Sequence, residues 1–348
     1  MVHRPIGSQG LRQRPYTLTL TRDKYLQGRR DVVYIQERIK DTVDVSEIMK
    51  FIGSDSDKSK LSSQSGEKFD YIPTKYIRVP VDSATVVGNG TVAPENAHQL
   101  RGDIIISLNR RHLTKSDVMV LDLLAANNWE RPVYFVSLGH SGTLGLEPYM
   151  QLEGLAYRLV PIKGGGSNYL TYGRIDTKIF YDNLMNKFLW RGINDPEVHL
   201  DHFHERTLSV IRFRHNYVRL AEALMAENKK DSAIAVLDRC VQLAPHSRLP
   251  YGYFVPGIVE TYAKLGEKDK ALAIINDHVA TLSDELTYYT GLDRKYANYV
   301  DQESRLNLQL MQNYMQVLEQ LNEAEKLEEM RNAFNGFYMS YNSKMQGQ

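Results

Sequence analysis

The pattern of apolar and polar positions is clearest over residues 114–136, which read TKSDVMVLDLLAANNWERPVYFV. Thr114 and Asp117 have the spacing of a capping box, which predicts the start of a helix. Apolar residues then recur at spacings of three and four, so this helix has one apolar face. Asn127 and Asn128 predict its end, because Asn tolerates left-handed backbone. The apolar run PVYFV that follows predicts a buried strand, so the segment is half of an α/β layer.

Segments upstream of this helix show the period of two that is typical of strands. Ile77, Val79 and Val81 alternate with polar neighbours, which predicts a strand with one apolar face. The string DIIISL, at residues 103–108, predicts a buried strand. A short helix is expected after Asp44, a residue type that favours the first position of a helix. These elements indicate an α/β or α+β domain built on a small sheet.

The last third of the chain has helical periodicity almost throughout and contains internal repeats. Two copies align at a distance of 38 residues, from 228 to 266, and each follows an apolar helix. Ala233 and Ala271 stand where two helices would cross closely, and we place Ala324 of a weaker third copy in the same slot. The pattern resembles the tetratricopeptide repeat, although the Trp-Leu-Gly signature of that repeat is missing. The three copies cover residues 228–245, 266–283 and 321–330.

These patterns predict a small α+β or α/β sheet domain followed by an all-α domain of tetratricopeptide-like helical repeats. A length of 348 residues suits two domains. Arg, Gln, Gly and Pro are scattered through the first residues without periodicity, which is typical of a flexible segment. We therefore expect a flexible N-terminal segment over residues 1–28, the sheet domain over 29–200 and the helical-repeat domain over 201–348.

Composition and charge narrow the classes of function. The formal net charge of +1 provides no basic field, so we expect no nucleic-acid partner. The single cysteine, Cys240, excludes an internal disulfide. No run of about 18 apolar residues is present to span a membrane, and the N-terminus lacks the apolar core of a secretory signal. From the sequence as it stands, the chain is expected to remain where it is made.

The densest cluster of candidate metal ligands is VHLDHFHER. Its imidazoles and carboxylates are ligand types that zinc prefers. As a strand or as a helix, however, the segment does not reproduce a known ligand spacing. The alternative is a solvated link into the first repeat helix, and we assign no metal and no cofactor to the chain. The weak metal candidates are His199, Asp201, His202 and His204.

Four residues of the central segment are candidates for a pocket or for a structural role. Asp122 lies in an apolar helix, where a carboxylate is either a catalytic acid or is paired with Arg131 or a backbone amide. Trp129 either stacks on a sugar or packs in the core, and Glu130 and Arg131 flank the turn. We assign no catalytic role to them. Four further polar residues could line a sugar pocket, with no geometry fixed by the sequence: Glu147, Glu153, Arg158 and Lys163.

Four long strings of the sequence resemble one protein family. They are YIPTKYIRVPVD, LTKSDVMVLDLLAANNWERPVYFV, LGLEPYMQLEGLAYRLVPIK and YDNLMNKFLWRGINDPEVHLD. They look like the soluble C-terminal part of large Bacteroidetes membrane proteins with a DUF2723 domain, which are protein O-mannosyltransferase-like glycosyltransferases of the GT-C type. The resemblance covers roughly residues 25–345. It implies a multi-helix membrane domain before residue 1 and a location at the periplasmic face of the inner membrane.

The resemblance also implies that the catalytic carboxylate lies near the membrane helices, so no catalytic residue is carried over to this chain. The leading hypothesis is a non-catalytic periplasmic portion that docks on the membrane domain and presents an acceptor or a protein partner through its repeats. One alternative is a stand-alone adaptor whose helical repeats bind a peptide or protein. A second alternative is a soluble carbohydrate-active enzyme that uses paired carboxylates. The donor sugar, the acceptor, the partner and the oligomeric state do not follow from the sequence.

Overall fold

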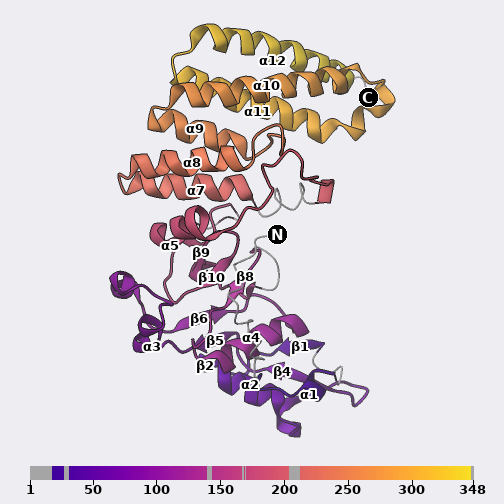
Figure 1. The fold of residues 1–348 in the computed structure, drawn as a ribbon. Coiled ribbons are helices and arrows are strands. Elements are labelled where there is room, and N and C mark those ends of the chain that lie inside the picture. The colour runs from indigo at the N-terminus through magenta and orange to yellow at the C-terminus, as the bar shows by residue number, and fades with distance from the viewer. Residues whose placement is uncertain are drawn as a thin grey trace. The chain divides into compact units, whose positions relative to one another are not determined.

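The structure is a computed structural model that describes residues 18–26, 31–138, 143–166, 168, 170–203 and 212–345. The chain divides between Asp176 and Thr177 into two compact units, which we call the sheet unit and the helical unit (Figure 1). The boundary expected from the sequence lay at residue 200. It lies earlier because α5 (Thr177–Tyr181) packs against α7 (Phe213–Ala226) and Thr177 donates a hydrogen bond of 2.9 Å to Glu227.

In the described part of the sheet unit the strands form three small sheets. The first has the strand order β3-β4-β1-β7, the second β2-β5-β6 and the third β11-β9-β10-β8. Each of the three mixes parallel and antiparallel neighbours, so the unit is of the α+β type. The strands are β1 (Val32–Ile35), β2 (Val43–Asp44), β3 (Lys60–Ser62), β4 (Lys68–Ile72), β5 (Tyr76–Val79), β6 (Ile104–Ser107), β7 (His112–Thr114), β8 (Tyr134–Phe135), β9 (Met150–Leu152), β10 (Tyr157–Leu159) and β11 (Arg174–Ile175).

Two helices, α2 (Val45–Gly53) and α4 (Lys115–Asn127), contact each other and the first sheet. Both begin where the sequence predicts. Asp44 accepts a hydrogen bond from the backbone of Ser46 at the start of α2, and Thr114 and Asp117 form the predicted capping box of α4. The remaining helices of this unit are short: α1 (Arg22–Leu26), η1 (Asp57–Ser59), α3 (Ser83–Gly88), η2 (Pro94–Gln99) and η4 (Glu147–Tyr149).

Two predicted strands differ from the expectation of full burial. Within PVYFV only β8 forms, and Tyr134 and Val136 are 48% and 74% exposed. In β6, Ile104 and Ile106 are buried but Ile105 is 43% exposed. Arg78 lies opposite Ile105 on the central strand β5 and is exposed as well, so this face of the sheet is open to solvent. An apolar run does not reveal whether one face or both faces of its sheet are covered.

Part of the expected flexible segment is ordered. Leu20 and Tyr25 are buried, and α1 packs as a short helix within the sheet unit. The expectation of a flexible segment over 1–28 is therefore wrong for residues 18–26. Residues 1–17, 27 and 28 lie outside the described residues.

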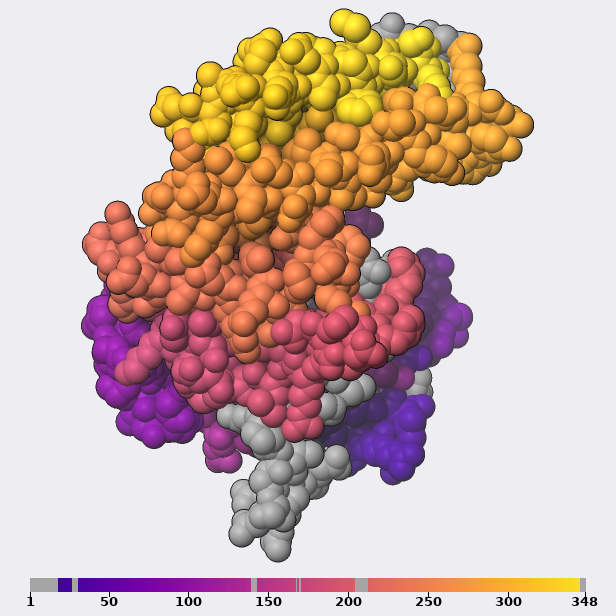
Figure 2. All heavy atoms as spheres, turned by 45° about the horizontal axis from the view of Figure 1, so that its top comes forward, coloured from indigo at the N-terminus to yellow at the C-terminus, as the bar shows by residue number. Residues whose placement is uncertain are grey.

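The described residues of the helical unit form three consecutive helical hairpins, α7 with α8, α9 with α10 and α11 with α12. Figure 1 shows them stacked one on another. Neighbouring hairpins contact through α7 with α9 and through α9 with α11. Figure 2 shows α12, in yellow, with its side chains open to solvent on the side that faces the viewer. The helices are α5, η5 (Asp182–Lys187), α7, α8 (Lys230–Leu243), α9 (Val255–Leu265), α10 (Lys268–Gly291), η6 (Arg294–Tyr299), α11 (Asp301–Gln320) and α12 (Ala324–Met345).

The three hairpin turns are built in the same way. Each has one residue in the left-handed region: Asn228 at φ 61°, Gly266 at φ 88° and Asn322 at φ 57°. In each turn the next backbone N–H donates to the carbonyl five residues earlier, as in a Schellman motif; these bonds are Lys229 to Leu224, Glu267 to Tyr262 and Glu323 to Leu318. The sequence repeats therefore correspond to three equivalent hairpins.

The sequence predicts an alanine at the close contact between the two helices of each hairpin, and this prediction is confirmed in two copies and wrong in the third. Ala233 and Ala271 are fully buried, and each lies five residues after its left-handed turn residue. The equivalent residue of the third hairpin is Leu327, whose backbone N–H donates to Glu323 as those of the two alanines donate to Lys229 and Glu267. Ala324 is exposed at the start of α12. The sequence alignment was out of register because it matched the small residue and not the turn.

Candidate functional site

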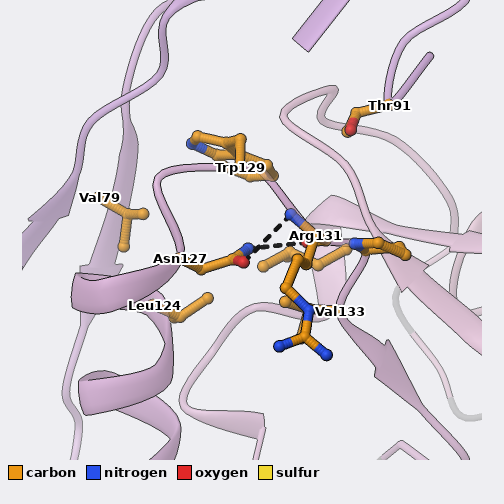
Figure 3. A pocket seen from close by; sticks show the side chains of 9 residues that line it. Val79, Thr91, Leu124, Asn127, Trp129, Arg131 and Val133 are labelled. Carbon is orange, nitrogen blue, oxygen red and sulfur yellow. Dashed lines mark hydrogen bonds between the residues drawn. The ribbon is translucent and has the colours of Figure 1, made fainter. Parts of the chain in front are cut away.

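The turn between α4 and β8 forms a small pocket, shown in Figure 3. Asn128 and Trp129 both have left-handed backbone, at φ 45° and φ 63°. The Asn127 side chain donates to the Arg131 carbonyl at 2.8 Å and accepts from the Arg131 N–H at 3.2 Å, which closes the turn. The cavity has a volume of about 10 Å³, which is room for about one water molecule and not for a sugar ring.

Trp129 serves as an anchor for this turn. Its indole N–H donates to the Pro80 carbonyl at 2.7 Å, and its own carbonyl accepts from the Asn89 side chain at 2.7 Å. The side chain is buried, so its face is not open to a ligand. Glu130 is exposed, and Figure 3 shows the Arg131 guanidinium pointing away from the indole ring. Of the two readings of Trp129, packing in the core fits this geometry.

Asp122 is completely buried and accepts four hydrogen bonds from the N-terminal segment. The donors are the backbone N–H and hydroxyl of Thr19, the backbone N–H of Leu20 at 3.1 Å and the hydroxyl of Tyr25 at 2.7 Å. A buried carboxylate is stabilised by such donors in place of a cation. Backbone amides are thus partners of Asp122, as one reading of the sequence held, while none of these four bonds comes from Arg131. The carboxylate holds residues 19–25 against α4.

A row of polar side chains crosses the third sheet. Arg174 lies opposite Gln151, Gln151 opposite Arg158, and Arg158 opposite Tyr134, so these four side chains share one face. Glu153 lies two residues after Gln151, accepts hydrogen bonds from Gln151 at 2.8 Å and from Tyr134 at 2.7 Å, and pairs with Arg158 at 3.8 Å. Partial burial lowers the pKa of the Arg174 guanidinium.

This polar row fastens the turn at Thr91 and the helix η2 to the sheet. Arg158 donates to the Thr91 hydroxyl at 3.2 Å, and Arg174 donates to the Gln99 side chain at 3.2 Å. The structure thus brings Glu153 and Arg158 together, as a sugar-pocket hypothesis would require. Glu147 instead accepts a hydrogen bond from Thr143, and Lys163 is exposed. The named contacts of the row hold protein groups to one another, so its evident role is structural.

The candidate metal ligands near residue 200 lie on the surface. His199, Asp201 and His202 are exposed, and His204 lies outside the described residues. Among the described residues, no three His, Cys, Asp or Glu side chains come close enough together to hold a metal ion.

A buried polar cluster in the helical unit was not found from the sequence. Arg214 of α7 is buried and donates to the backbone carbonyls of Ala244, Leu249 and Pro250, so it fixes the end of α8 and the loop after it. The Tyr251 ring lies 5.0 Å from the guanidinium carbon. Burial lowers the pKa of Arg214. An arginine held by carbonyls leaves no signal in the sequence, because its partners are backbone atoms some 30 residues away.

Two histidines belong to the same cluster. His246 Nδ1 accepts from the Tyr251 backbone N–H at 2.9 Å, and its Nε2 bonds to Thr281 at 2.9 Å. His278 is 1% exposed, and its Nδ1 lies 2.6 Å from the Tyr314 hydroxyl. Burial, with His246 and Arg214 nearby, lowers the pKa of His278 to about 4. His278 is therefore neutral at physiological pH and acts as a hydrogen-bonding residue of the core.

Comparison with known proteins relates the sheet unit to a described family. Residues 9–179 match the family model of TMEM260-associated domain 2. This family is linked to membrane proteins that resemble glycosyltransferases. The end of the match coincides closely with the division between the two units at residues 176 and 177. The TMEM260-associated domain 2 match thus covers the sheet unit and leaves the three helical hairpins outside it. No curated protein and no solved structure matches the chain significantly.

Within the part of the chain that the structure describes, no helix combines the length and the apolar composition needed to cross a bilayer.

Proposed function

We propose that this chain is a non-catalytic portion of a membrane glycosyltransferase of the DUF2723 kind. In this proposal the sheet unit docks on the membrane domain, and the helical unit holds an acceptor or a protein partner. The proposed location is the periplasmic face of the inner membrane of a Bacteroidetes cell. The observation that carries the proposal is the match of residues 9–179 to TMEM260-associated domain 2.

The geometry of the sheet unit supports the non-catalytic part of the proposal. A catalytic acid needs a carboxylate that reaches a substrate. Asp122 is completely buried and bonded to four donors, and Glu153 is 6% exposed and bonded to Gln151 and Tyr134. Both carboxylates therefore bind other parts of the protein.

The helical unit supports the partner-binding part. Stacked helical hairpins form extended surfaces whose residues come from several helices, and proteins of this architecture commonly bind other molecules there. The three equivalent turns at Asn228, Gly266 and Asn322 show that the hairpins repeat one structural plan.

A transfer assay and a binding assay test the two halves of the proposal. The purified chain, supplied with lipid-linked hexose donors and an acceptor protein, is expected to give no transfer. The same chain is expected to copurify with a detergent-solubilised membrane domain of a DUF2723 protein, whereas an unrelated helical-repeat protein of similar size should not. Sugar transfer by the chain alone would refute the non-catalytic role, and failure to copurify would refute the docking.

A stand-alone adaptor that binds a peptide or protein is the second candidate, and the three hairpins are the observation that favours it. The DNA before codon 1 separates the two candidates. A continuous reading frame that encodes several hydrophobic helices supports the membrane enzyme, whereas a ribosome-binding site directly before Met1 supports the adaptor. A soluble carbohydrate-active enzyme is the third candidate, and hydrolysis of an oligosaccharide by the purified chain would support it.

A further inference from the structure

An open hollow of about 440 Å³ lies in the helical unit between the loop before α9 and the first half of α11. Its size is within the range of sites that bind small ligands. Tyr253 lines it from the loop, and this residue is 47% exposed. The α11 side of the hollow is lined by Asp301, Gln302, Arg305, Leu306 and Gln309. Four of these six side chains carry planar polar groups.

The two charged residues of the hollow neutralise each other. Arg305 Nη2 lies 2.6 Å from the Asp301 carboxylate, and Arg305 Nε donates to it at 3.1 Å. The Tyr341 hydroxyl joins this pair, since it donates to Asp301 at 2.6 Å and accepts from Arg305 at 2.8 Å. The hollow therefore presents no net charge, and an anion or a cation gains little by binding there.

The remaining polar groups are the Tyr253 hydroxyl and two primary amides, and each of them can donate and accept hydrogen bonds. Gln302 and Gln309 are exposed, so their amide groups are accessible to a ligand. The row continues along α11 with Gln312 and Gln316, which are also exposed. Residues 302, 309 and 316 are seven apart, so they repeat every ~10 Å along one face of the helix. An exposed helix face more commonly carries charged residues.

The chemistry of this hollow matches a neutral sugar. A pyranose ring has an apolar C–H face and a rim of hydroxyls that each donate and accept. The hollow offers an aromatic ring in Tyr253 and an aliphatic side chain in Leu306, beside the amides of Gln302 and Gln309. Aromatic faces favour such apolar surfaces, and buried polar ligands need donors and acceptors at their rim.

A polypeptide fits the hollow less well. Peptides are recognised at a free sheet edge, in an apolar helix groove, on rows of aromatic residues or by clusters of charge. The hollow is lined by the loop before α9 and by α11, which contribute one aromatic ring and one aliphatic side chain. Its single guanidinium, that of Arg305, is already paired with Asp301. We infer that the hollow between Tyr253 and α11 is a binding site for a neutral oligosaccharide. This inference goes beyond the proposed function, because it concerns a ligand of the helical unit itself.

Saturation-transfer NMR on the full chain tests the site with neutral trisaccharides of glucose, mannose and galactose as probes. We expect transfer to the ring protons of at least one probe. Tyr253→Ala should weaken its binding about tenfold, which corresponds to ~1.4 kcal/mol. Tyr253→Phe should retain the binding, since it keeps the ring. Tyr288→Ala is the matched control, because Tyr288 is 64% exposed and does not line the hollow.

Gln309→Ala provides a second variant on an exposed position, so it should leave the fold intact even if Tyr253→Ala disturbs the loop. It is also expected to weaken binding. Absence of transfer to all three probes, or transfer that neither variant reduces, would overturn the inference. Binding of an uncharged decapeptide that depends on Tyr253, with no sugar bound, would overturn it as well and assign the site to a polypeptide. These outcomes are independent of copurification with a membrane domain, so the proposed function can fail or hold separately.

Discussion

Acid should destabilise the helical unit through His278. The folded protein keeps this side chain neutral down to about pH 4, because burial lowers its pKa to about 4. In the unfolded chain the pKa of a histidine is about 6.5, so the unfolded state binds a proton that the folded state does not bind. The unfolded state therefore gains free energy as the pH falls below about 6.5, and the stability that His278 contributes is lost between about pH 6.5 and pH 4.

The magnitude follows from the two pKa values. A difference from about 6.5 to about 4 corresponds in full to about 3 kcal/mol. Between pH 7 and pH 5 only part of this appears, and the linkage relation gives about 2 kcal/mol for His278 alone. That is a large share of the 5–15 kcal/mol typical of a folded domain. Carboxylates and His246 also contribute to the acid dependence, so the effect of His278 has to be isolated by a variant.

The matched variant is His278→Asn, whose side-chain oxygen can accept from Tyr314 but does not titrate in this range. Urea unfolding is followed at pH 7, 6 and 5 by tryptophan fluorescence in a Trp129→Phe background. This background leaves Trp190 as the only tryptophan. Its ring centroid lies 4.9 Å from that of Phe213 in the helical unit, so its fluorescence reports on this unit. The loss of stability from pH 7 to pH 5 should be smaller in the variant by about 2 kcal/mol. Equal losses with and without His278 would refute the reasoning.

Three substitutions test other parts of the structure. Asp122→Ala leaves four donors of the N-terminal segment without their acceptor, so it should destabilise the sheet unit by roughly 3–5 kcal/mol. Urea unfolding in a Trp190→Phe background, where Trp129 is the only tryptophan, measures this loss, and a loss below ~1 kcal/mol would contradict the role of this carboxylate. Gly266→Ala places a Cβ on a residue at φ 88° with open space around it, so only the backbone conformation is strained. The free energy of unfolding, measured by circular dichroism melts, should fall by about 1 kcal/mol. No change in stability would argue against the left-handed turn. Ala271→Leu should overpack the closed space around residue 271 and lower the free energy of unfolding by about 1–3 kcal/mol. Ala324→Leu should leave stability nearly unchanged in the same melts, because Ala324 is exposed. The reverse order of the two effects would support the alignment made from the sequence.

The sequence could predict features that depend on neighbouring residues. The capping box of Thr114 and Asp117 and the left-handed Asn128 are set by hydrogen bonds and backbone preferences within a few residues. The repeat of 38 residues likewise predicted two equivalent hairpins, because each copy carries its own turn signal at Asn228 or Gly266. Local signals of this kind are present in the amino-acid sequence itself.

The tertiary structure alone decided features that depend on residues far apart in the chain. Asp122 and its donor Thr19 are 103 residues apart, and His278 and Tyr314 are 36 apart, so no local pattern pairs them. The exposure of Tyr134 is likewise decided by packing, because the sequence does not show which face of a sheet is covered. The hollow beside Tyr253 likewise exists only because α9 and α11 pack together. Hydrogen bonds and packing between distant segments are fixed when the chain folds, since burial then selects which polar groups must find each other.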